Sequence, residues 1–510
     1  MGVFSSFHPR VFVLAAGLVA MAFVFIKIWR FFIQREFARR HGCQPVAKSG
    51  NKDPFLGLDT VCRNMRAAQE YKFLEKGCEK FHHLGNTYLT RMFLTPVIST
   101  AEPENIKTVL AINFKDYGIF HRLELFEPLL GRGIFDTDGD HWARSRALIR
   151  PNFARDQVAD LTMFEDLIPD LFALIPRDGK TTVDLQTLFF RYTTDSATDF
   201  LLGESVGSLK RTQSELSFAY AFDYALKSIV DRSLLGPLGA FYRDRKAGEC
   251  NRICREFVQQ YVEKAVHAAH PDGERKEKGY PEMKRQAYIF SHELASRTSD
   301  KRRILDELMN VLLAGRDTTA SLLSNMFFML AKNPAIWAKL RAEVASLEGR
   351  LPTYNELRNL KYVKCCMNES LRLHPVVPLN DRVALRDTVL PVGGGKDGLS
   401  PVFVAKDTMI SYNIYAMHRR TDFYGPDAEV FRPERWEDGR LQPRWEYLPF
   451  NGGPRICIGQ QYALTEASYV TVRMAQEFQA LESRDPGPWE EGLTLTLSSL
   501  NGTRVCVTPA

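Results

Sequence analysis

The chain has 510 residues, of which 45% are hydrophobic and 25% charged, a composition typical of a globular protein with a large core. Its net charge of +6 is small and dispersed, which excludes nucleic acid as the expected partner and favours a basic docking face for an acidic protein. Nine scattered cysteines without a CxxC spacing exclude a disulfide framework and indicate a reducing compartment. With no repeat or long linker in the sequence, we expect one large, mainly helical domain.

An apolar segment near the N-terminus predicts a membrane anchor. Residues 11–26 carry no charge but fall short of the ~20 residues that cross a bilayer core. Lys27 extends the segment because its long stem can reach the interface, where Trp29 also fits. Five basic residues follow the segment and one precedes it, so the positive-inside rule places everything after residue 33 in the cytosol.

A cleaved secretory signal is the alternative, because residues 20–22 (Ala-Met-Ala) resemble a cleavage site. The apolar run continues past this point and ends in a basic cluster, which favours an uncleaved anchor. We therefore predict a single-pass anchor at residues 1–33, a hinge at 34–56 and a globular domain at 57–510.

The first part of the globular domain is of mixed character. Leu89–Thr100 has β character, and Glu102–Leu110 is typical of a helix. A further helix starts near His141, and residues 180–270 show helical periodicity with few breakers. Pro271–Arg285 is highly charged and predicts an exposed loop.

A long helix is predicted from about Lys301 to Lys332, where Asn333 and Pro334 end it. Its middle reads Ala-Gly-Arg-Asp-Thr-Thr over residues 314–319, and Gly315 and Thr318 are poor residues for a helix interior. We expect the Thr318 hydroxyl to donate to the Ala314 carbonyl and Gly315 to leave a gap in the wall. The pair predicts a local groove in the helix wall; a helix kinked only for packing is the alternative.

Two charged residues share a face of the helix that follows. Glu369 and Arg372 stand three apart, just before His374 and Pro375. An exposed pair of this kind would contribute little to stability.

The segment Phe450–Gly459, Phe-Asn-Gly-Gly-Pro-Arg-Ile-Cys-Ile-Gly, places Cys457 just before a helical pattern. A helix N-terminus favours a thiolate, and Gly453 and Gly459 allow a flat ligand to approach closely. Arg455 offers a fork of donors suited to a carboxylate. A thiolate ligand and a carboxylate partner are what a haem requires; an inert buried cysteine in a turn is the alternative.

The segment resembles the haem-binding signature of the cytochrome P450 superfamily at Phe450, Gly453, Arg455, Cys457 and Gly459. This resemblance implies the P450 fold, mainly α with a smaller β-rich region. It also implies haem b between the cysteine loop and the long central helix, with Cys457 as the axial iron ligand.

The resemblance assigns roles to further residues. Haem propionates would pair with Trp142, Arg146, Arg382 and Arg455. Oxygen would lie against Ala314 and Gly315, with Thr318 and Asp317 as the proton relay. Glu369, Arg372 and Arg435 would form a structural triad that holds the cysteine loop.

The resemblance also implies a monooxygenase that uses O2 and electrons from a membrane-bound, NADPH-dependent flavoprotein reductase, at the endoplasmic reticulum. We expect the reductase to dock on the cysteine side, where Arg144, Arg155 and Lys361 are candidate contacts. An isomerase or dehydratase would tend to lack the pair Asp317 and Thr318, and a haem-dependent carrier would need no proton relay.

Segments such as Leu123–Phe135 and Gln460–Ala467 resemble the fungal n-alkane and fatty-acid terminal hydroxylases. This resemblance implies ω-hydroxylation of a fatty acid or n-alkane that arrives from the bilayer. Tailoring of a lipid-like secondary metabolite stays open as an alternative. The expected substrate-lining residues are 117–135, Leu313, Val376–Leu379 and Leu497–Leu500.

Overall fold

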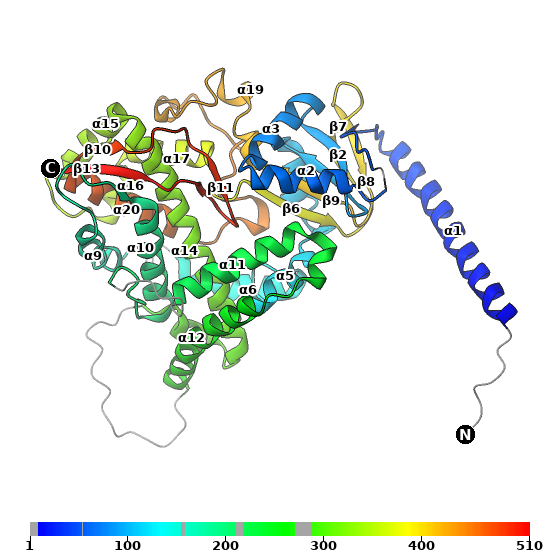
Figure 1. The fold of residues 1–510 in the computed structure, drawn as a ribbon, viewed down its shortest axis with the longest axis horizontal. Coiled ribbons are helices and arrows are strands. Elements are labelled where there is room, and N and C mark those ends of the chain that lie inside the picture. The colour runs from blue at the N-terminus through cyan, green and yellow to red at the C-terminus, as the bar shows by residue number, and fades with distance from the viewer. Residues whose placement is uncertain (1–8, 54, 155–158, 211–217, 271–287) are drawn as a thin grey trace.

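The computed structural model describes residues 9–53, 55–154, 159–210, 218–270 and 288–510. The long helix α14 (Lys301–Lys332) runs through the middle of the molecule, with the predicted bounds (Figure 1). Asp300 begins it by accepting a hydrogen bond from the Arg303 backbone N–H at 3.1 Å. The predicted loop Pro271–Arg285 and the predicted docking residue Arg155 lie outside the described residues.

Helices surround α14 on most sides, and it packs directly against α10, α12, α17 and α20. Its side chains are buried around most of its circumference, as expected for a helix inside a large core. The other helices are α2 (Leu58–Gln69), α3 (Phe73–Leu84), α4 (Pro103–Lys107), α5 (Leu123–Leu130), α6 (Gly139–Ile149), α8 (Thr162–Glu165), α9 (Ile168–Ala173), α10 (Leu185–Leu202), α11 (Phe218–Leu234), α12 (Arg245–Ala269), α13 (Phe290–Arg297), α15 (Pro334–Val344), α16 (Tyr354–Asn359), α17 (Lys361–Leu373), α18 (Ile414–Met417), α19 (Thr421–Tyr424) and α20 (Gln460–Glu477).

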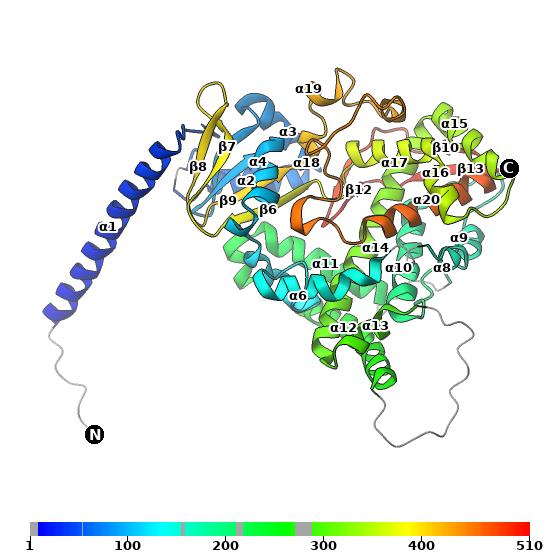
Figure 2. The same cartoon turned by 180° about the vertical axis from the view of Figure 1, so that it is seen from behind.

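A smaller β-rich region lies beside the helical part (Figures 1 and 2). Its largest sheet has the strand order β1-β2-β3-β9-β6-β4 and a hydrophobic cluster of its own. The strands of this sheet are β1 (Ala47–Lys48), β2 (Thr87–Met92), β3 (Thr95–Thr100), β9 (Met409–Asn413), β6 (Leu379–Ala384) and β4 (Tyr117–Gly118). The smaller sheets contain β7 (Thr388–Gly394) with β8 (Ser400–Val404), β11 (Glu491–Leu493) with β12 (Leu497–Ser499), and β10 (Phe478–Ser483) with β13 (Arg504–Pro509) and β5 (Val183–Asp184).

Helix α1 (Pro9–Arg40) projects away from the rest of the molecule (Figures 1 and 2). Its segment Ala16–Arg40 is long and apolar enough to cross a membrane, and none of its most apolar window is buried. Its C-terminal end contacts the globular part, where Gln34 Nε2 donates to Asp387 Oδ1 at 3.2 Å. The helix continues past the predicted boundary at residue 33 because residues 34–40 contain no breaker.

Candidate active site

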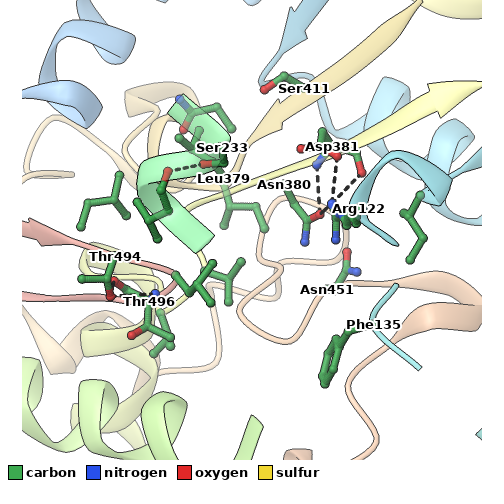
Figure 3. A pocket seen from close by; sticks show the side chains of 18 of the residues that line it. Arg122, Phe135, Ser233, Leu379, Asn380, Asp381, Ser411, Asn451, Thr494 and Thr496 are labelled. Carbon is green, nitrogen blue, oxygen red and sulfur yellow. Dashed lines mark hydrogen bonds and ion pairs between the residues drawn. The ribbon is translucent and has the colours of Figure 1, made fainter. Parts of the chain in front are cut away.

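A cavity of about 1440 Å³ lies between the cysteine loop and α14. Ligand pockets are typically about 300–1,000 Å³, so this cavity has room for a large cofactor together with a substrate. It is lined by Cys457 from the cysteine loop and by Ala314, Gly315 and Thr318 from α14. The two sequence motifs therefore face the same cavity. Figure 3 shows another part of its wall, where Arg122 Nη2 donates to Asp381 Oδ1 on β6 at 2.9 Å.

The cysteine loop is held by short backbone hydrogen bonds. The Cys457 N–H donates to the Phe450 carbonyl at 2.9 Å, and Gly459 immediately precedes α20. Gly453 has a φ of 67°, and a Cβ there would lie 1.9 Å from the Leu110 carbonyl oxygen. Glycine is therefore required at 453 by the close approach of the neighbouring backbone.

The helix N-terminus was expected to favour the thiolate form of Cys457, but the surroundings of the sulfur act in the opposite direction. Burial raises the pKa of the Cys457 thiol, and the Gly459 N–H and the Arg146 guanidinium oppose this increase without overcoming it. Coordination to a metal would favour loss of the thiol proton and so act against this increase.

The cavity wall fits a haem. Gly459 and Gly315 both line the cavity, and a Cβ at either position would meet no protein atom closer than 3.5 Å. The surrounding protein would tolerate a side chain at both positions. The absence of a side chain therefore keeps space open in the cavity, where a flat ligand can lie. Cys457 adds a sulfur donor to the same wall, and arginines add cations suited to propionates.

All four predicted propionate partners line this cavity: Trp142, Arg146, Arg382 and Arg455. Arg382 is buried, and its Nη1 donates to Asn380 Oδ1 at 3.1 Å and to the Asp381 carbonyl at 2.6 Å. Because these acceptors are neutral, its positive charge stays available for an anion.

Arg455 stacks its guanidinium 4.4 Å from the centre of the Trp142 ring and donates to Asp138 Oδ1 at 2.7 Å. Burial lowers the pKa of Arg455 to about 10, so it stays charged. Arg146 donates to the Ile456 carbonyl at 3.0 Å, next to the cysteine. Helix α6 and the cysteine loop are thereby joined at the cavity wall.

On α14, Thr318 Oγ1 donates to the Ala314 carbonyl at 2.7 Å, which confirms the predicted hydrogen bond. Asp317 is buried beside it but does not line the cavity, and its Oδ1 accepts from Arg316 Nη1 at 2.9 Å. Burial raises the pKa of Asp317 to about 6, against the opposing effect of Arg316.

Sequence reasoning missed the ion chain that continues from Asp317. Arg316 is buried, and its Nη2 lies 2.6 Å from Oδ1 of Asp223 on α11, a side chain that is 52% exposed. A second cavity of about 250 Å³ reaches Arg316, Asp223 and Thr194. Solvent can therefore approach the Asp317 side of α14 without entering the main cavity. The signal in the sequence was Arg316 itself, inside the motif.

The triad residues meet in the interior. Glu369 Oε1 accepts from Arg372 Nη2 and from Arg435 Nε, both at 2.8 Å, and Glu369 and Arg372 are 0% exposed. Although burial alone would raise it, the pKa of Glu369 is held below its usual value by the Arg372 and Arg435 guanidinium groups. The triad joins α17 to the 3-10 helix η7 (Pro433–Trp436).

His418, which sequence reasoning also missed, connects this triad to the cysteine loop. Its Nδ1 lies 3.2 Å from the Arg372 carbonyl oxygen, and its Nε2 accepts from the Leu448 N–H at 2.9 Å. Leu448 stands two residues before Phe450. The isolated His gave no signal in the sequence, because its partners come from distant segments.

Most of the segments expected to contact substrate line this cavity, and one does not. Leu313, Val376, Leu379 and parts of residues 117–135 line it. Leu497–Leu500 does not, because β12 packs against α14, where Asn325 Nδ2 donates to the Leu497 carbonyl at 2.8 Å. The preceding residues 493–496 occupy the wall instead.

A family model for cytochrome P450 matches residues 64–503. The chain is 51% identical over 475 residues to cytochrome P450 monooxygenase himC of Aspergillus japonicus, which covers 92% of this chain and 85% of that one. It is 46% identical to cytochrome P450 monooxygenase fsdH of Fusarium heterosporum, over 96% of this chain and 87% of that one. It is 40% identical to cytochrome P450 52A5 of Candida maltosa, over 96% of each.

The cysteine loop and the long central helix face each other across one cavity, the arrangement expected of a haem-thiolate enzyme. The chain belongs to the cytochrome P450 family. It is a monooxygenase, an oxidoreductase of the predicted mainly α fold, and the family uses haem b with a cysteine thiolate as axial ligand. The family works with a redox-partner reductase, O2 and hydrophobic substrates.

Proposed function

We propose that this cytochrome P450 hydroxylates the terminal carbon of a fatty-acid or n-alkane chain. The observation that carries the proposal is one large cavity, mostly apolar, that is lined both by Cys457 and Thr318 and by exposed residues of α2 and α3. A long chain can therefore enter at the surface and reach the cysteine side. Helices α2 and α3 lie on the side of the molecule from which α1 extends, which suits a substrate taken from a bilayer (Figure 1).

In this proposal Cys457 is the axial ligand of haem b, and Arg146, Arg382, Arg455 and Trp142 hold its propionates. Bound haem with a thiolate ligand supplies the activation of O2. Phe450, Gly453 and Gly459 shape the loop beneath it. Glu369, Arg372 and Arg435 act structurally, because none of the three lines the cavity.

In this proposal α14 supplies protons to the reaction through Thr318 and Asp317. Thr318 lines the cavity, and its hydroxyl donates its single proton to the Ala314 carbonyl. Its oxygen can accept a hydrogen bond from a group in the cavity, and the hydroxyl would pass its own proton on only by giving up the bond to Ala314. Asp317 takes protons from solvent on the other side, through the second cavity beside Arg316. In this proposal Thr318 faces the main cavity, and its neighbour Asp317 faces the side of α14 that solvent can reach.

Electrons come from an NADPH-dependent flavoprotein reductase in this proposal. Arg144 on α6 and Lys361 at the start of α17 are exposed and offer positive charge for docking. Helix α1 anchors the protein in the endoplasmic reticulum membrane, with the globular part in the cytosol. Haem reduction by the reductase should slow as ionic strength rises, because salt screens such contacts. A rate indifferent to salt would contradict the electrostatic docking.

The function is tested by incubating the purified holoenzyme with reductase, NADPH and fatty acids and n-alkanes of graded chain length. We expect ω-hydroxylated products from a limited range of lengths, identified by mass spectrometry. Absence of oxygenated product from every chain would contradict the lipid assignment and leave the tailoring of a secondary metabolite as the alternative.

A further inference from the structure

The hairpin formed by β11 and β12 enters the wall of the large cavity. Its two strands pair antiparallel. The Thr494 N–H donates to the Thr496 carbonyl at 2.9 Å and closes the turn between them. Residues 493–496 line the cavity, and Figure 3 shows Thr494 and Thr496 in its wall. We call residues 493–496 the hairpin tip.

Helix α14 holds one side of this hairpin. Ser321, three residues after Thr318, donates from Oγ to Thr496 Oγ1 at 3.0 Å, and both of these hydroxyl residues are buried. The hydrogen bond from Asn325 to the Leu497 carbonyl adds a second connection one turn further along α14. The hairpin tip is therefore held to the same helix that brings Thr318 to the cavity.

At the base of the hairpin, Glu491 caps α3. Its Oε2 accepts a hydrogen bond from the Leu74 N–H at 2.8 Å, and its Oε1 accepts one from the Phe73 N–H. These are the first two N–H groups of α3, which have no acceptor within the helix, and Lys72 before them provides no side-chain cap. Glu491 is 5% exposed and lies in the cavity wall. The helix dipole also favours a carboxylate at this end.

The capping contact connects two parts of the cavity wall. Helix α3 contributes Phe73, Lys80 and Phe81 to the wall, beside the hairpin tip. The hairpin thus links α3 to α14 through hydrogen bonds that are buried at both ends. Because its strands are short and paired, a change at Glu491 should move α3 relative to the hairpin tip. A misplacement of about 1 Å can change a reaction rate about a hundredfold.

We propose that Glu491 is a positioning residue for the substrate. By capping α3 it sets the spacing between α3 and the hairpin tip, and thereby which carbon of a long chain is oxidised. Glu491 does not act on the reacting atoms itself. This inference rests on the proposed function and deepens it, because it assigns the preference for the terminal carbon to a contact in the cavity wall.

The test measures the ratio of terminal to subterminal hydroxylated product with the full-length holoenzyme, reductase and NADPH. The substrates are dodecanoic acid, hexadecanoic acid and hexadecane. A ratio depends only on the molecules that turn over, so partial unfolding of a variant does not change it. Glu491→Leu keeps the bulk of the side chain but has no acceptor, and the ratio should fall about tenfold. Glu491→Gln keeps an acceptor, and its ratio should stay within about twofold of the wild-type value.

Hydrogen exchange at the start of α3 supplies a measurement that does not depend on turnover. In the wild-type holoenzyme the Phe73 and Leu74 amides should exchange slowly, because a buried carboxylate accepts from both. Glu491→Leu should speed their exchange about tenfold or more, and Glu491→Gln should have a smaller effect. Mass spectrometry of a peptide that contains residues 72–76 follows both amides.

The matched control removes a carboxylate cap outside the cavity wall. Asp244 accepts from the Ala247 N–H at 3.0 Å at the start of α12, and none of the described residues of α12 lines the cavity. Asp244→Ala should lower stability without changing the product ratio. Glu491→Asp keeps the charge but shortens the link by one methylene, so it should lower the ratio and serves as a second variant if Glu491→Leu does not retain haem. The ferrous carbon monoxide spectrum of each variant reports bound haem.

The possible outcomes separate the two proposals. A wild-type ratio in Glu491→Leu or Glu491→Asp, with haem bound, overturns the positioning role and leaves the hydroxylase proposal standing. Unchanged amide exchange in Glu491→Leu also overturns it, as does an equal fall of the ratio in Asp244→Ala. If the wild type forms no terminally hydroxylated product from any of the three substrates, the hydroxylase proposal itself is contradicted, and the positioning role falls with it.

Discussion

Thr318 is the residue on which proton delivery depends in this account. Replacing it by alanine removes the hydroxyl that faces the cavity but leaves α14 and its burial intact. We expect Thr318→Ala to keep consuming NADPH while product per NADPH falls about tenfold or more, since general acid catalysis contributes at least this much. Thr318→Ser keeps the hydroxyl and should recover most of the yield. An alanine variant with wild-type yield would remove Thr318 from the mechanism.

His418 makes stability depend on pH. Burial, with a contribution from Arg372, lowers its pKa to about 3, whereas an exposed histidine titrates near about 6.5. Between these values the unfolded chain binds a proton that the native protein does not. Stability is therefore fully present above pH ~6.5 and falls as the pH decreases, by up to about 1.4 kcal/mol per pH unit from this group.

His418→Gln removes this titration and keeps an acceptor for the Leu448 N–H. We expect its thermal unfolding midpoint to decline less steeply than that of the wild type between pH 6 and pH 4. Parallel declines would show that His418 does not contribute to the pH dependence of stability and would contradict the assigned pKa direction.

At the scale of elements, the buried ion pairs of Glu369 that join α17 to η7 should contribute strongly to the free energy of unfolding. Glu369→Gln leaves the buried Arg372 and Arg435 guanidinium groups without their shared carboxylate. Breaking a buried pair of this kind costs about 3–5 kcal/mol. Urea unfolding of the holoenzyme should show this loss together with easier release of haem. His418 joins Arg372 to Leu448 near the cysteine loop, so a displaced Arg372 should loosen that loop as well.

The matched control for this change is Glu429→Gln. Glu429 also pairs with an arginine, Arg419 at 3.0 Å, but its side chain is 71% exposed. Its loss should cost about 0–1 kcal/mol. Similar losses for the two variants would contradict a special role for the triad.

At the scale of the whole molecule, α1 should decide membrane attachment. Its exposed apolar surface favours a bilayer through burial, which salt does not screen. We expect the full-length protein to stay in the membrane fraction through a high-salt wash. A variant without residues 1–40 should be released by salt and still bind haem, since α1 contributes only its last turns to the globular part. Release of the full-length protein by salt would rule out α1 as a spanning anchor.

Much of the molecule could be predicted because its signals are local. The bounds of α14 follow from Asp300, Asn333 and Pro334, and the Thr318 hydrogen bond spans four residues of one helix. The glycine at 453 was recognised from the signature, although its cause, the nearby Leu110 carbonyl, belongs to a distant segment. Local geometry could therefore be predicted from the sequence, whereas the packing partners of these residues could not.

Other features arise only when distant segments meet. Asp317 was expected to relay protons, but its partner Arg316 and the exposed Asp223 become a chain only through the packing of α11 on α14. The helix N-terminus before α20 was expected to favour a thiolate, whereas burial by surrounding segments dominates the pKa of Cys457. Burial depends on the whole fold and leaves no short-range pattern in the sequence.

The central claim is that Cys457 supplies the sulfur ligand of the haem iron. The most direct measurement is the absorption spectrum of the purified ferrous protein with carbon monoxide, for the wild type and for Cys457→Ser. The account predicts a strongly red-shifted Soret band for the wild type, characteristic of a thiolate ligand, and its loss in the serine variant. A red-shifted band that survives the substitution, or is missing from the wild type, would contradict it.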